Sequence, residues 1–186
     1  VANLLNEIND YLKRIEQAID ALSEVNMGAT AIGTGINASP KYINKVITHL
    51  NKFSGEELHL AKDLIDSTRN LDSFAWASAA IKTLAINMSK MASDLRLMSS
   101  SIIDEINLPH VQQGSSIIPG KYNPVVPEVV NQVCYSVIGS DVTVTFACEG
   151  GQLQLNVFEP VVAYSLFNSI IMLEKAMKTL ADKCID

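Results

Sequence analysis

The chain has 186 residues, of which 48% are hydrophobic, so it can bury a core of its own or form part of a larger domain. Asp and Glu number 20 against 14 Lys and Arg, a net charge of −6, which argues against a nucleic-acid-binding protein because such proteins present a basic face. No apolar run is long enough to span a bilayer and no signal peptide is recognisable, so we expect a cytoplasmic protein without a membrane partner.

The first element expected is an amphipathic helix over residues 2–26. Its apolar side chains recur at three- and four-residue steps, which is the spacing of one helix face; they include Leu4, Leu5, Ile8, Leu12, Ile15, Ile19 and Leu22. Three glycines between residues 28 and 35 end this helix, and a short helix is expected over 41–52.

A long helix is then expected over residues 55–98. Ser54 and Glu57 have the spacing of a capping box at its start, and no Gly or Pro after Gly55 interrupts it. Trp76 is expected to pack inside the bundle that such a helix forms. Residues 99–126 are instead polar and rich in Ser, Gly and Pro, which is typical of a functional loop.

Two further helices complete the expected fold. Pro127 suits the first turn of the next helix. Residues 142–146 alternate like a strand, but a strand without a partner is improbable in a helical chain, so we predict helix there. After a break at Gly150 and Gly151, the last helix is expected over 157–183. The fold class is therefore all-α, an elongated bundle of long helices.

The ends of the sequence suggest an excised piece of a longer protein, because the chain opens without Met and shows a helical pattern at once. We expect residues 1–186 to be a single, partial helical-bundle domain. Several helices are apolar over more than one face, as in the Ser-Ile-Ile-Met-Leu run at 169–173, which predicts an obligate oligomer. The three cysteines lie in apolar stretches without a Cys-x-x-Cys pair, which indicates buried, reduced thiols; they are Cys134, Cys148 and Cys184.

Residues 114–124 read Gly-Ser-Ser-Ile-Ile-Pro-Gly-Lys-Tyr-Asn-Pro. This segment resembles the signature of the aspartase/fumarase superfamily, Gly-Ser-Ser-x-Met-Pro-x-Lys-x-Asn-Pro. Ile118 replaces the usual Met, and Tyr122 stands where a small apolar residue is common. The resemblance extends to the Gly-rich turn at 28–37, and the segments 127–133 and 151–157 resemble aspartases more than fumarases.

The resemblance implies the central helical domain of an enzyme that eliminates ammonia from L-aspartate to give fumarate. Removing a proton from the carbon beside a carboxylate requires a base, and fixed donors that stabilise the enediolate-like intermediate. In the family the base is the first serine of the signature, which is Ser115 here. We call residues 109–126 the signature loop.

The other site residues are also implied by the resemblance. Ser116, Lys121 and Asn123 would bind the substrate. Gly114 and Gly120 would let backbone N–H groups approach it, and Glu128 would orient a histidine of another subunit. No cofactor and no metal site is expected. The family's enzymes are homotetramers in which three subunits build each active site, so this chain alone is expected to be inactive.

Two alternatives stay open. A fumarase-type hydro-lyase would use the same loop, because both reactions remove a proton beside a carboxylate. A helical assembly module without catalysis is the alternative of a different class. The segment between Leu97 and Glu105 is shorter than in the family, through either a true deletion or unobserved residues. His59 and His110 are expected to face solvent, and the Thr-His pair at 48–49 is rejected as a family motif because its flanking residues are missing.

Overall fold

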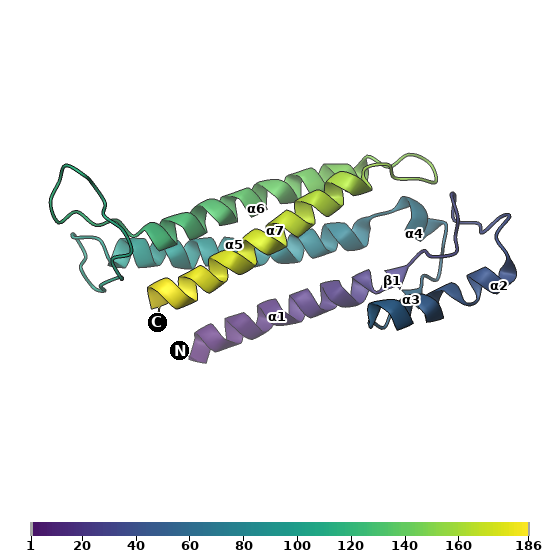
Figure 1. Cartoon of the computed structure of the whole chain (residues 1–186), viewed down its shortest axis with the longest axis horizontal. Helices are drawn as coiled ribbons and strands as arrows, with labels where there is room; N and C mark the ends of the chain where they lie inside the picture. The colour runs from purple at the N-terminus through teal and green to yellow at the C-terminus, as the bar shows by residue number, and fades with distance from the viewer. Residues whose placement is uncertain (1, 186) are drawn as a thin grey trace. The chain divides into compact units, whose positions relative to one another are not determined.

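The computed structural model describes residues 2–185, with residues 2–8 described in their backbone only, so the side chains of Leu4, Leu5 and Ile8 lie outside the described residues. Figure 1 labels the α-helices and the first strand of the described part. The elements are α1 Ala2–Leu22, β1 Glu24–Val25, α2 Pro40–Ile43, α3 Val46–Ser54, β2 His59–Leu60, α4 Asp66–Arg69, α5 Asp72–Met98, α6 Val125–Glu149, α7 Glu159–Leu180 and a π-helical turn, Ala181–Ile185. The prediction of an all-α bundle of long helices is confirmed.

The chain divides into two compact units. Unit 1 consists of Val1–Ala80 and Asp141–Ser165, and unit 2 of Ile81–Ser140 and Leu166–Asp186. Helices α5, α6 and α7 therefore contribute residues to both units. That residues 1–186 form a single domain stays a prediction.

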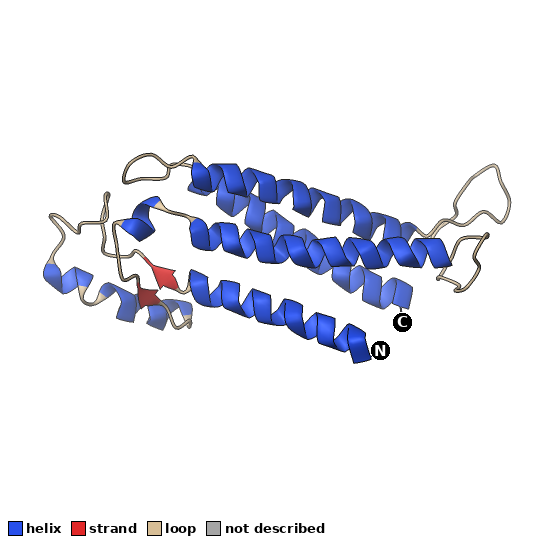
Figure 2. Cartoon of the chain, turned by 180° about the vertical axis from the view of Figure 1, so that it is seen from behind, coloured by secondary structure: helices blue, strands red, loops and turns tan. Residues whose placement is uncertain are grey.

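In unit 1, α1 ends four residues earlier than predicted. The Ser23 hydroxyl donates to the Asp20 carbonyl (2.6 Å), and the next two residues leave the helix as β1. β1 pairs in parallel with β2, Glu24 opposite His59 and Val25 opposite Leu60. The two strands are drawn in red in Figure 2. These ladder hydrogen bonds replace the last turn that we predicted for the helix.

The prediction of one continuous helix over 55–98 is wrong for residues 55–71. Gly55 adopts a left-handed conformation (φ 77°) and ends α3, and the Ser54 hydroxyl accepts from the Glu56 amide instead of capping a new helix. The chain then forms β2 and the single turn of α4 before α5 begins at Asp72. The short helix predicted over 41–52 is likewise two helices, α2 and α3.

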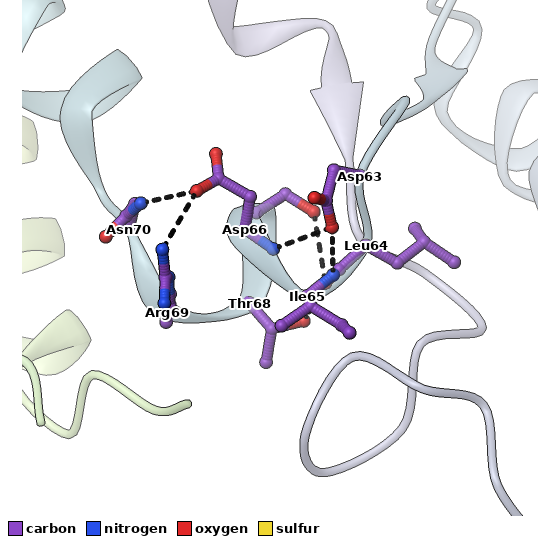
Figure 3. A network of polar contacts seen from close by, with 8 residues as sticks. Asp63, Leu64, Ile65, Asp66, Thr68, Arg69 and Asn70 are labelled. Carbon is purple, nitrogen blue, oxygen red and sulfur yellow. Dashed lines mark hydrogen bonds and ion pairs between the residues drawn. The ribbon is translucent and has the colours of Figure 1, made fainter. Parts of the chain in front are cut away.

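Side-chain hydrogen bonds at the turn before α4 account for the break (Figure 3). One carboxylate oxygen of Asp63 accepts from the backbone amides of Ile65 and Asp66, at 3.0 and 3.1 Å. Such an aspartate turn competes with helical hydrogen bonding. The Asp66 carboxylate in turn accepts a hydrogen bond from the side-chain amide of Asn70 (2.6 Å). The backbone of Asn70 is extended, which ends α4.

The C-terminal part of α6, which belongs to unit 1, confirms the choice of helix over strand at residues 142–146. Asp141, Val144 and Ala147 are buried at three-residue steps, as on one face of a helix. The buried Asp141 carboxylate accepts a hydrogen bond from the Ser78 hydroxyl of α5 (2.8 Å). Trp76 was predicted to be packed, but its side chain is 55% exposed.

In unit 2, α6 runs antiparallel to α5 and α7 (Figure 1). The three helices enclose a core of small and β-branched side chains; its buried members are Ala85, Met88, Ala92, Val126, Val130, Cys134, Val137, Leu173, Ala176, Leu180 and Cys184. Alanine at three of these positions, 85, 92 and 176, lets the helix backbones approach closely. The last helix ends at Leu180, slightly before the predicted residue, and continues as the π-helical turn.

The loop between α5 and α6 begins with a closed turn. The Glu105 amide donates to the Met98 carbonyl (2.9 Å), and Asp104 has φ 53°. These contacts satisfy carbonyls at the end of α5. α6 starts at Val125 with Pro127 in its first turn, as predicted. Among the described residues, no helix is long and apolar enough to cross a membrane.

Candidate functional site

The signature loop lies in unit 2, and its two sides are joined at a narrow neck. The Gly114 amide donates to the Lys121 carbonyl (2.8 Å), and Gln113 and Tyr122 form an isolated antiparallel bridge. A Cβ atom on Gly114 would lie 2.8 Å from that carbonyl oxygen. Glycine is therefore required at 114 for the neck to close.

Ser115, the predicted base, sits just inside the neck and is half-buried. Its hydroxyl oxygen accepts hydrogen bonds from the backbone amides of Ile117 and Ile118, both at 3.1 Å. Two amide donors aimed at one oxygen stabilise negative charge on it more than on a neutral hydroxyl. The same two donors would stabilise the alkoxide form that a serine base requires.

Four of the predicted residues line one small pocket of about 130 Å³ in the loop. They are Ser115, Ser116, Gly120 and Lys121, together with Gln113, Ile117, Ile118, Pro119 and Tyr122. Gly120 has φ 71°, a left-handed conformation that permits the turn before Lys121. The residues that line the pocket thus include two serines, Ser115 and Ser116, and one cation, Lys121.

The three remaining predicted residues, Gly114, Asn123 and Glu128, do not line this pocket. The Asn123 side-chain oxygen lies 3.1 Å from where a Cβ atom of Gly114 would be, so this side chain packs at the neck. Glu128 lies in the first turn of α6 and is half-buried; its backbone amide donates to the Pro124 carbonyl (3.1 Å). Its predicted histidine partner would belong to another subunit, so this role stays a prediction.

A buried polar cluster between α5 and α6 was not predicted from the sequence. The Asn131 amide group donates to the Ser89 carbonyl (2.8 Å) and to the hydroxyls of Ser89 and Ser93. Its oxygen accepts from Arg96 (3.1 Å). Asn131 follows the buried Val130 in α6. An amide side chain within an apolar run of the sequence could have indicated a buried polar contact there.

A second missed feature is an aromatic stack beside the neck. The rings of His110 and Tyr122 lie 3.7 Å apart between centroids, with their planes inclined by 6°. His110 is exposed, as predicted, but it is not isolated. Nothing in the linear spacing of these two residues indicated the contact.

The described residues contain no group of three or more His, Cys, Asp or Glu side chains that could hold a metal ion. The cysteines are also unsuited to nucleophilic catalysis. Burial raises the pKa of Cys134 from 9.0 to about 11, and burial likewise raises the pKa of Cys148 and of Cys184. All three are therefore protonated at neutral pH. Cys134 and Cys184 are buried as predicted, whereas Cys148 is half-buried and donates to the Leu71 carbonyl (3.3 Å).

Comparison with known proteins identifies the class. A protein-family model described as lyase matches residues 2–139, and the chain belongs to this lyase family. It is 49% identical over 178 residues to the aspartate ammonia-lyase of Helicobacter pylori, covering 92% of this chain and 38% of the relative. It is 51% identical over 187 residues to the aspartate ammonia-lyase of Pseudomonas aeruginosa, covering 99% of this chain and 39% of the relative. The predicted resemblance to aspartases is confirmed.

Solved structures support the fold and the membership of this lyase family. A fumarate lyase:delta crystallin from Brucella melitensis bound to cobalt matches with a TM-score of 0.92 and 47% identity, covering 97% of this chain and 40% of the other. A class II fumarase from Schistosoma mansoni matches with a TM-score of 0.85 and 27% identity, covering 97% and 43%. The chain thus spans about 40% of the length of the relatives it matches.

Proposed function

We propose that this chain is the central helical part of an aspartate ammonia-lyase, which converts L-aspartate into fumarate and ammonia. Identities near 50% to two enzymes of that name support the substrate, and the identity to the class II fumarase is only 27%. The observation on which the chemistry rests is the pair of amide donors on the Ser115 oxygen.

In this reaction Ser115, as the alkoxide, removes a proton from the carbon beside the side-chain carboxylate. The electron pair moves into that carboxylate and gives an enediolate-like dianion. The pair then returns to form the carbon–carbon double bond while the carbon–nitrogen bond breaks and ammonia leaves. The added charge on the carboxylate is stabilised by Lys121, with hydrogen bonds from Ser116 and Asn123.

The remaining residues support this site. Gly114 and Gly120 permit the neck and turn that hold Ser115 beside Lys121. Glu128 orients a histidine of a neighbouring subunit. Lys121 is exposed in this chain, and the neighbouring subunits of a homotetramer would cover it and exclude water from the reaction. We propose that this enzyme is cytoplasmic. No cofactor takes part in the proposed reaction.

The assay is the ultraviolet absorbance of fumarate, formed by the complete enzyme from L-aspartate in one sample and from L-malate in another. We expect fumarate from aspartate only, and none from the 186-residue chain alone. Fumarate from malate would instead assign a fumarase. Fumarate from neither would leave a helical assembly module.

Ser115→Ala tests the base. Because the variant keeps Lys121 and Asn123 but has no group to take the proton, we expect kcat to fall by at least about 10³-fold with KM changed little. The matched control is Ser101→Ala, an exposed serine of the same connection outside the pocket, which should leave kcat unchanged. Near-normal turnover of Ser115→Ala would refute the assignment.

A further inference from the structure

The His110–Tyr122 stack joins the two sides of the signature loop outside its neck. The centroid separation of 3.7 Å and the inclination of 6° describe two rings in face-to-face contact. The residues lie twelve positions apart, so the stack closes a loop that contains Ser115 and Lys121. A contact that closes a loop reduces the number of conformations available to the residues inside it.

Tyr122 lies directly between Lys121 and Asn123 in the chain. Its bridge to Gln113 holds the backbone of this stretch against the other side of the loop. Fixing the ring against His110 fixes the backbone from which the Lys121 and Asn123 side chains project.

The other attachments of this stretch are made by backbone atoms or by the glycine. They include the hydrogen bonds from the Gly114 amide to the Lys121 carbonyl and from the Lys121 amide to the Ile118 carbonyl, the bridge itself and the close approach of Asn123 to Gly114. The stack differs from these contacts because it is formed by two side chains. A substitution can therefore remove it without altering the backbone groups of the neck.

We propose that His110 and Tyr122 are a positioning pair that holds Lys121 and Asn123 in the orientation that binds the substrate carboxylate. The proposal rests on the proposed function of the loop. Neither ring has to touch the substrate. The stack restricts the loop before aspartate binds. Less conformational entropy is then lost on binding, so the free energy of binding is more favourable.

The test uses the complete enzyme and steady-state kinetics with L-aspartate. Tyr122→Ala and His110→Ala should each raise KM by about three- to ten-fold, the range expected for loss of one aromatic pair. The double variant should be no worse than either single variant, because both remove the same stack. Tyr122→Phe keeps a ring of the same size and should retain the original KM within about two-fold.

A matched control separates positioning from general loss of a surface tyrosine. Tyr42 in α2 is 47% exposed, close to the 48% of Tyr122, and belongs to unit 1. Tyr42→Ala should leave KM unchanged. The melting temperature is recorded for every variant, because a merely structural role would lower it without the selective change in KM and without rescue by phenylalanine.

Three outcomes would overturn the proposal. The first is an unchanged KM in Tyr122→Ala, the second is additive effects in the double variant, and the third is failure of Tyr122→Phe to restore KM. A complete enzyme that forms no fumarate from aspartate would refute the proposed function instead. The stack itself is checked apart from activity by the proton NMR signal of the His110 ring, which Tyr122 should shift upfield and Tyr122→Ala should return to its ordinary position.

Discussion

At the scale of single residues, Gly33 shows how closely two segments of unit 1 approach each other. Its φ is +81°, and a Cβ atom there would overlap the Ile65 backbone and lie 2.6 Å from the Leu64 carbonyl oxygen. Gly33→Ala would combine a disfavoured backbone conformation with a steric overlap that no side chain can relieve. We expect a loss of about 3 kcal/mol or more in the free energy of unfolding, measured by urea denaturation followed by circular dichroism.

Gly139 is the matched control. It lies within α6, and a Cβ atom there would meet no atom within 4 Å. Gly139→Ala should stabilise the helix by up to about 1 kcal/mol, because alanine restricts the unfolded chain. Equal destabilisation by both substitutions would contradict this account of Gly33.

At the scale of elements, Asn131 joins α5 to α6 in unit 2. Its side chain is 2% exposed and makes hydrogen bonds with Ser89, Ser93 and Arg96. Asn131→Leu would leave the buried Ser89 hydroxyl without this partner while adding apolar volume to a filled site. We expect the free energy of unfolding to fall by about 2–4 kcal/mol, measured by urea denaturation.

The neighbouring Gln132 provides the control for Asn131. It is exposed, and its side-chain amide donates only to the Glu128 carbonyl one turn earlier in α6 (3.3 Å). Gln132→Leu should change the unfolding free energy by less than about 0.5 kcal/mol. A comparable loss in both variants would show that α6 tolerates no leucine there, rather than that Asn131 joins two helices.

The elements also show what the sequence could predict. The main part of α5, α6 and α7 followed from apolar spacing, because burial on one helix face dictates that spacing. The break between residues 55 and 71 did not follow. It depends on the Asp63 side chain and on the pairing of β1 with β2, which connects residues 35 positions apart. Apolar periodicity in a sequence reports only on residues within one or two helical turns of each other.

The candidate site could likewise be predicted only in part from the sequence. Its residues could be selected from the order Gly-Ser-Ser and Lys-x-Asn in residues 114–123, because that order is itself the family signature. The amides directed at Ser115, the Asn131 cluster and the His110–Tyr122 ring contact could not be read from spacing. Each of these contacts depends on how the loop or the helices are folded.

At the scale of the whole molecule, α6 and α7 present large apolar side chains to solvent. On α6 these include Val142 and Phe146 in unit 1, which lie four residues apart and so share one helix face. On α7 they include Phe167 and Ile171 in unit 2, also four residues apart. Contiguous apolar stripes of this kind are unfavourable in water unless a partner covers them.

We therefore expect the complete protein to sediment as an oligomer, a tetramer if the proposed assembly is correct. Phe146→Glu and Phe167→Glu, at side chains 69% and 65% exposed, should shift the sedimentation equilibrium toward smaller species, because a charge on a covered apolar surface disfavours association. Phe53→Glu is the control, since Phe53 is 85% exposed on α3, outside these stripes, and should leave the association unchanged. A folded protein that is strictly monomeric would contradict the prediction, and it would also remove the means by which neighbouring subunits cover Lys121.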